Sequence, residues 1–145
     1  MKSTLLFIFL GISVVVFAQS EEEAIIALLE KESATWRSGD IEAHAQCWAV
    51  RPYGRIFVST QDGSSFDVPP ALMRNPPANM IGNGGTSKNT NYKMNISGNH
   101  AWVTHDEEST SKDGKTTYTY EMRILEKIDG KWRLVGQSIH PRTPE

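Results

Sequence analysis

The stretch 116–128 carries the residue types most suited to acid–base chemistry, namely a carboxylate and an arginine one strand repeat apart. Strand alternation divides it into an aromatic and aliphatic face and a polar face: Tyr118, Tyr120, Met122 and Ile124 against Thr117, Thr119, Glu121 and Arg123. Burial favours the aromatic face, so we expect it to point inward, with Glu121 and Arg123 as an ion pair outside or at an interface. In the opposite orientation, Glu121 and Arg123 would line a pocket as an acid–base pair.

Histidine supplies the other titratable candidates. His44 precedes Cys47 by three residues on one helical face, and it could reach a pocket rim as a base. We expect a buried, hydrogen-bonded histidine there and a buried, inert Cys47. His105 opens the sequence His-Asp-Glu-Glu, in which alternation leaves two side chains on each face. A metal site needs three or four converging ligands, so we predict no metal centre.

Aromatic residues are the remaining candidates for binding chemistry. They gather where the predicted helices meet the first strand and along the long strand, and a buried Trp or Tyr also needs a hydrogen-bond partner. The predicted pocket candidates are Trp36, Trp48, Tyr53, Phe57, His105, Tyr118 and Tyr120. The glycines at 82–85 have no following helix, so they do not form a phosphate-binding loop, and we predict no cofactor.

Two helices are predicted at the start of the domain. Residues 21–37 have a helical apolar face, Ser20 and Glu23 have capping-box spacing, and Ser38-Gly39 ends the helix. Asp40 caps a shorter helix that runs to about Trp48, because the proline at 52 disfavours helix before it.

Strands dominate the rest of the chain. We predict a strand at 55–59, a helical turn at 69–74, and strands at 91–97, 100–110, 116–128 and 131–139. Residues 75–91 are predicted as a long loop, or as a loop with a frayed strand edge. The Asp-Gly pairs at 113–114 and 129–130 are hairpin turns. The predicted fold class is α+β, with the N-terminal helices packed in the concave face of a curved antiparallel sheet.

Composition sets the class of protein and its partners. The 145 residues include 15 Lys and Arg against 17 Asp and Glu, a net charge of −2, and 39% are hydrophobic. This is globular composition without the basic face that nucleic-acid binding needs. Residues 1–18 have one lysine and an apolar run too short to span a bilayer, with small residues before Gln19. We therefore expect a signal peptide cleaved near Ala18, export to the periplasm or outside, no membrane anchor afterwards, and one domain over 19–145.

Three stretches resemble the nuclear transport factor 2-like superfamily, which includes SnoaL-like cyclases and ketosteroid isomerases. They are the helix end WRSGDIEA at 36–43, the strand start NHAWVT at 99–104 and the closing hairpin EKIDGKWRLV at 126–135. The resemblance spans the predicted mature chain. It implies a cone-shaped fold with an apolar pocket between the sheet and the long first helix, and a homodimer that pairs through the sheet.

Three functions are compatible with this fold, because the fold by itself does not select one. We expect an exported domain that binds a small apolar or amphipathic molecule, with no established catalytic activity. The alternatives are an isomerase, cyclase or dehydratase that uses a pocket acid–base pair, and a non-catalytic dimerisation or interaction module. Pocket volume and an ionisable group inside the pocket distinguish the three.

Overall fold

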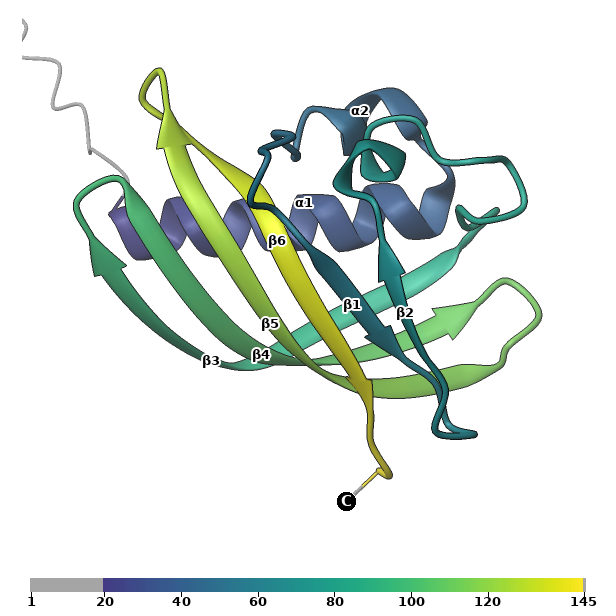
Figure 1. Ribbon diagram of the computed structural model, residues 1–145. Helices are drawn as coiled ribbons and strands as arrows, with labels where there is room; N and C mark the ends of the chain where they lie inside the picture. The colour runs from purple at the N-terminus through teal and green to yellow at the C-terminus, as the bar shows by residue number, and fades with distance from the viewer. Residues whose placement is uncertain (1–19, 145) are drawn as a thin grey trace, which may run out of the picture.

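The computed structural model describes residues 20–144, so the predicted signal peptide lies outside the described residues. A long helix α1 and a short helix α2 precede a six-stranded sheet, with a 3-10 turn η1 between its second and third strands (Figure 1). The elements are α1 Glu21–Ser38, α2 Ile41–Ala45, β1 Ile56–Ser59, β2 Ser65–Val68, η1 Pro70–Met73, β3 Gly85–Ser97, β4 His100–Ser111, β5 Thr116–Ile128 and β6 Lys131–Pro141.

Both ends of α1 have the capping residues that the sequence predicts. The Ser20 side chain accepts from the Glu23 amide, and the Glu23 carboxylate accepts from the Ser20 amide, which completes the predicted capping box. Gly39 ends the helix at φ 80°, a left-handed conformation that suits glycine. Helix α2 begins after the predicted cap Asp40 but ends at Ala45, three residues before the predicted end.

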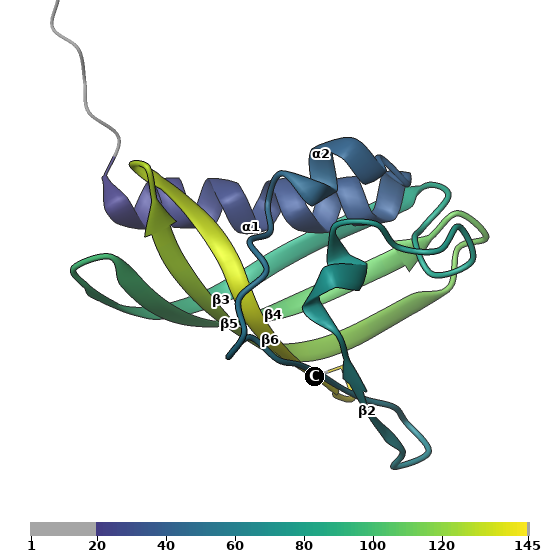
Figure 2. The ribbon, with the colours of Figure 1, turned by 45° about the horizontal axis from the view of Figure 1, so that its top comes forward.

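The sheet has the strand order β2-β1-β6-β5-β4-β3. Neighbouring strands are antiparallel except β1 and β6, which pair in parallel. Strands β3 to β6 form the predicted meander and bend around α1, which lies along their concave side (Figure 2). The α+β fold class is confirmed.

Two predictions about the strands are wrong. Strand β2 has no counterpart in the prediction, because its four residues acquire strand geometry by pairing with β1. Strand β3 begins at Gly85, inside the predicted loop 75–91. Its first half pairs with β4 up to a bulge at Asn91, whose φ of 57° explains the asparagine there. Glycine and asparagine obscured this strand in the sequence because pairing, and not local propensity, stabilises it.

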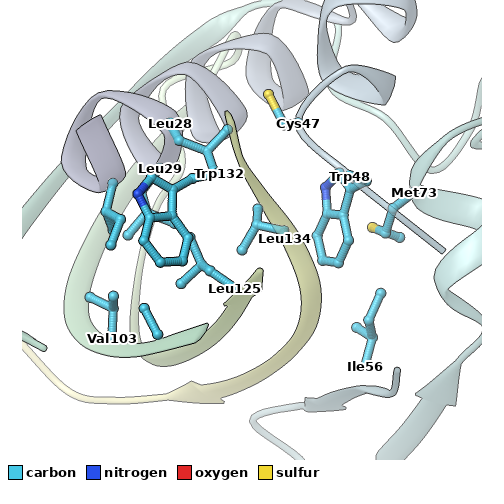
Figure 3. Packing of buried hydrophobic residues seen from close by; sticks show 12 residues of the cluster. Leu28, Leu29, Cys47, Trp48, Ile56, Met73, Val103, Leu125, Trp132 and Leu134 are labelled. Atoms are coloured by element: carbon cyan, nitrogen blue, oxygen red, sulfur yellow. The ribbon is translucent and has the colours of Figure 1, made fainter. Parts of the chain in front are cut away.

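The apolar core lies at one end of the space between α1 and the sheet. Leu29 from α1 packs with Val103, Leu125 and Trp132 from the strands, and Figure 3 shows this group beside Leu134. Burying a leucine side chain contributes about 1.5–3 kcal/mol, so this group is a major source of stability. On the other side of Leu134 lies a second group of buried residues, formed by Trp48, Ile56 and Met73 (Figure 3). The predicted burial of Cys47 is confirmed, and burial raises its thiol pKa to about 11, which keeps it in the unreactive thiol form.

No helix within residues 20–144 has the length and apolar character required to cross a membrane.

Candidate functional site

A cavity of about 250 Å³ lies at the other end of the space between α1 and the sheet. Its apolar wall comes from α1, β1, β2, β6, η1 and the segment after η1: Trp36, Ile56, Val58, Val68, Met73, Met80 and Ile139. Its polar wall comes from α1 and strands β4 to β6: Glu32, Ser33, Arg37, Glu107, Glu121, Arg123 and Gln137. A cavity of about 150 Å³ admits benzene, so this one has room for a larger compact molecule.

The segment 74–84 closes one side of the cavity and places Met80 in its wall. The amide of Gly82 donates to the Trp36 carbonyl oxygen at 3.0 Å, and the amide of Gly84 donates to that of Arg37 at 2.8 Å. A Cβ on Gly39 would lie 2.5 Å from the Gly82 carbonyl oxygen, so this close approach requires glycine. The segment is therefore attached to the end of α1.

The orientation of β5 is the reverse of the preferred prediction. Glu121 and Arg123 are buried and line the cavity, while Tyr120, Met122 and Ile124 are exposed on the outer face. The reason lies in α1, which presents Glu32 and other polar side chains to the inner face of β5. The buried cation Arg123 therefore pairs with a buried anion. The predicted Glu121–Arg123 ion pair does form, but inside the protein.

Arg123 is the centre of the polar wall. Its guanidinium forms ion pairs with Glu121, with Glu32 at 3.2 Å and with Glu107 at 3.9 Å. Its Nε donates to His105 Nε2 at 3.4 Å. Burial opposes the charged form of Arg123, but the three carboxylates outweigh it and raise its pKa further. Arg123 is therefore a permanent cation shared among three acids.

Glu32 also connects the cavity to a second buried group. Its Oε1 accepts from His44 Nε2 at 3.0 Å and from Trp48 Nε1 at 3.2 Å. Burial would raise its pKa, but the charge of Arg123 and the hydrogen bond from His44 lower it to about 2. Glu32 is therefore an ionised structural carboxylate.

His44 is buried and hydrogen-bonded, as the preferred interpretation of the sequence expects. Its Nδ1 donates to the Met73 carbonyl oxygen at 2.7 Å, and its Nε2 meets Glu32. Both ring nitrogens of His44 are therefore occupied by protein groups. The structure does not place His44 in the cavity wall, where the alternative role as a base requires it.

Glu107 and its neighbours complete the polar wall. Its carboxylate accepts from Ser33 at 2.8 Å and Ser109 at 2.7 Å, and it pairs with Arg37 at 3.5 Å. Both of its oxygens therefore already accept hydrogen bonds from protein groups. His105 lies behind this wall, where burial and then the charge of Arg123 lower its pKa to about 4, so it is neutral near pH 7.

Glu121 is the carboxyl in the wall best suited to gain or lose a proton near neutral pH. Burial raises its pKa to about 7, with a contribution from repulsion by Glu107 and Glu32, against the attraction of Arg123. Thr119 donates to its Oε1 at 3.0 Å. Glu121 can therefore donate or accept a proton at the cavity surface.

The aromatic candidates separate in space. Trp36 lines the cavity, while Trp48 lies in the core behind it and donates to Glu32. The other four lie elsewhere: Tyr53 and Phe57 are exposed, Tyr118 packs on Arg142, and Tyr120 is on the outer face. As pocket residues these four predictions are wrong, because they are not on the face that α1 covers.

Three residues of the site, Glu32, Glu107 and Gln137, were not predicted from the sequence. A signal for Glu32 was present, since it follows Leu28 and precedes Trp36 by four residues and so interrupts the apolar stripe of the helix. Glu107 shares the alternation of the buried Val103 and His105, which would have placed it inside.

Among residues 20–144, no group of three His, Cys, Asp or Glu side chains is arranged to hold a metal ion.

Comparisons of the sequence with protein-family models and with curated proteins find no match. Solved structures do match over most of the chain. An NTF2-like protein of unknown function from Methylobacillus flagellatus is 22% identical, with 92% of this chain and 100% of that chain covered and a TM-score of 0.60. One from Shewanella oneidensis is 18% identical, with 83% and 98% covered and a TM-score of 0.61. A Nostoc punctiforme protein of unknown function with a cystatin-like fold is 14% identical, with 87% and 96% covered and a TM-score of 0.65. The chain therefore has the nuclear transport factor 2-like fold.

Proposed function

We propose that this chain binds a small, partly apolar molecule in the cavity between α1 and the sheet. The observation that supports this most is the cavity itself, about 250 Å³ of space with one apolar and one polar wall. Ligand sites combine apolar surface, which supplies affinity, with a few polar groups that orient the ligand. A scaffold with only a structural role would gain stability by filling the same space with side chains.

A cavity-filling substitution tests this proposal. Val58 lines the cavity, so we expect Val58→Trp to fill it and to abolish the rise in melting temperature that a bound ligand causes. The matched control is Phe57→Trp on the same strand, whose side chain is exposed and does not line this cavity. The measurement is a thermal-shift screen of small amphipathic molecules against the three proteins. If ligands stabilise Val58→Trp as much as the unmodified protein, the cavity is not the binding site.

We also propose that two copies pair through the outer face of the sheet. Large hydrophobic side chains are exposed there and form what we call the outer patch: Phe57, Trp102, Tyr120, Met122 and Ile124. Clustered exposed apolar side chains are typical of interaction surfaces. The occupant we propose is a second copy, because the same patch on two copies is self-complementary in a twofold dimer.

Charge placed in the outer patch should separate the two copies. We expect the protein to sediment as a dimer and the double variant Trp102→Lys, Ile124→Lys to sediment as a monomer, because lysine in an apolar interface is left unpaired. Ala27→Lys, on the exposed side of α1, is the control and should remain dimeric. A monomeric unmodified protein at micromolar concentration would contradict this proposal.

Export remains part of the proposed function. Support comes from the lysine and the apolar run within residues 1–18. We expect the mature protein to begin at Gln19, which intact-mass measurement of the expressed protein would test. Recovery of the full-length chain from the cytoplasm would contradict export.

A further inference from the structure

Each carboxylate of the polar wall already has a partner with which it forms an ion pair or a hydrogen bond. Glu32 pairs with His44 at 3.0 Å, Glu107 with Arg37 at 3.5 Å, and Glu121 with Arg123. Arg123 also lies within reach of Glu32 and Glu107, which links the pairs into one cluster. His105 adjoins this cluster as a neutral ring. A ligand with its own charge would add an unpaired charge to a buried cluster whose carboxylates already have partners, and this is costly.

Some buried polar atoms of the wall have no hydrogen-bond partner in the part of the chain that the structure describes. Gln137 is 7% exposed, and its Oε1 has no hydrogen-bond partner within residues 20–144. Glu121 is 5% exposed, and its Oε2 meets Arg123 as an ion pair without the alignment of a hydrogen bond. Both atoms are acceptors, because Oε1 of an amide and Oε2 of a carboxylate carry lone pairs only. Both residues line the cavity.

The arginine donors of the wall lie in ion pairs, but two of them have no hydrogen-bond partner among the described residues. Arg37 and Arg123 lie in ion pairs with Glu107 and Glu32, although Nε of Arg37 and Nη1 of Arg123 are not aligned for hydrogen bonds. A carboxylate or phosphate ligand at these nitrogens would share its arginine with a glutamate, among three acidic side chains. A hydroxyl can donate to Gln137 Oε1 or Glu121 Oε2 and also accept from one of the unpartnered arginine nitrogens, and all of these residues line the cavity.

We propose that the ligand is an uncharged alcohol, whose hydroxyl donates to Gln137 Oε1 or Glu121 Oε2 while its compact hydrocarbon part packs on Trp36 and Met80. This inference rests on the proposed function and adds the chemical class of the ligand. The hydroxyl satisfies a buried acceptor, so an alcohol gains a hydrogen bond that a ketone of the same skeleton lacks. The apolar wall supplies affinity for both molecules in common.

Four probes with the same number of non-hydrogen atoms separate the possibilities. They are α-methylbenzyl alcohol, acetophenone, α-methylbenzylamine and benzoate, which present a neutral donor, a neutral acceptor, a cation and an anion. Each is titrated into the full domain at pH 8, where the Glu121 carboxyl is mostly ionised. Binding is followed by two-dimensional amide NMR, which detects the weak affinities of small fragments and locates them in the protein.

We expect the alcohol to bind about tenfold more tightly than acetophenone, and both to bind more tightly than the amine and benzoate. The double variant Gln137→Leu, Glu121→Met should bring the alcohol and the ketone to within about twofold of each other, because it removes both acceptors but keeps an apolar wall. Glu108→Gln, on the exposed side of β4, is the control and should leave the ranking unchanged. An unchanged preference for the alcohol in the double variant Gln137→Leu, Glu121→Met would overturn the assignment of its partner atoms.

The outcomes distinguish the two proposals. Tighter binding of acetophenone, the amine or benzoate than of the alcohol overturns the alcohol assignment and leaves the proposed binding function standing. If none of the four probes shifts the resonances of cavity residues, and the broader thermal-shift screen also finds no ligand, the proposed function fails and the alcohol assignment fails with it.

Discussion

Replacing Arg123 with methionine should destabilise the protein by about 3–5 kcal/mol at pH 7. Arg123 is 2% exposed and is the cation shared by Glu32, Glu107 and Glu121. Methionine retains much of the side-chain volume but leaves these carboxylates without their common partner. The free energy of unfolding, measured by urea titration with tryptophan fluorescence, reports the change.

Two comparison variants make this result specific. Arg55→Met removes an exposed arginine that pairs with the exposed Asp67, and it should change stability little. Adding Glu121→Gln to Arg123→Met should recover part of the loss, because it removes one of the unpaired buried acids. A loss for Arg123→Met no larger than that for Arg55→Met would show that the three carboxylates do not depend on Arg123.

Glu121→Gln should stabilise the protein above pH 7 and have little effect near pH 4.5. The pKa of Glu121 rises from 4.5 to about 7 in the folded state, chiefly because of burial. A carboxyl with a raised folded-state pKa contributes stability that is fully present below the unfolded value of 4.5 and is lost as the pH rises to about 7. Glutamine resembles the protonated carboxyl and does not titrate, so the variant avoids this loss.

The expected gain is on the order of 2–3 kcal/mol above pH 7, and it should grow steadily between pH 4.5 and 7. It is read as the difference between the two proteins in urea titrations across this range. The difference is needed because His105 has an opposite effect: its lowered pKa gives stability that is lost as the pH falls from 6.5 towards 4. A difference that does not change with pH would mean that Glu121 stays ionised throughout this range.

Glu108→Gln is the matched control for this experiment. Glu108 lies on β4 with an exposed side chain, so its removal changes the same type of group without changing the buried cluster. Its difference from the unmodified protein should stay small and flat across the range.

Local signals were sufficient for the ends of α1 and for the hairpin turns of the meander β3 to β6. The capping box at Ser20 and Glu23, Gly39 at the end of α1 and the Asp-Gly hairpin turns depend on a few neighbouring residues, and all are confirmed. At the turn before β6, Asp129 and Gly130 both adopt positive φ, as the predicted hairpin requires. Strands β2 and β3 show the limit of such signals, because their extent depends on partners distant in the chain.

The candidate site was only partly predictable. Trp36, Glu121 and Arg123 were named from the sequence, but the favoured orientation of β5 placed both charged residues outside. Hydrophobicity misled here because an exposed aromatic face and a buried ion pair are each rare, and the protein contains both. The two are connected if the outer patch is covered by a second copy, as we propose.

The sequence by itself determined which segments are helices and hairpins, the α+β class and the burial of Cys47 and His44, because these follow from neighbouring residues and periodicity. Only the tertiary structure decided which face of β5 meets α1, and with it the identity of the cavity wall. Alternation divides a strand into two faces without saying which is inside. That choice depends on the contact between Glu32 and Arg123, which are more than ninety residues apart in the chain. Their opposite charges offset the cost of burying both side chains.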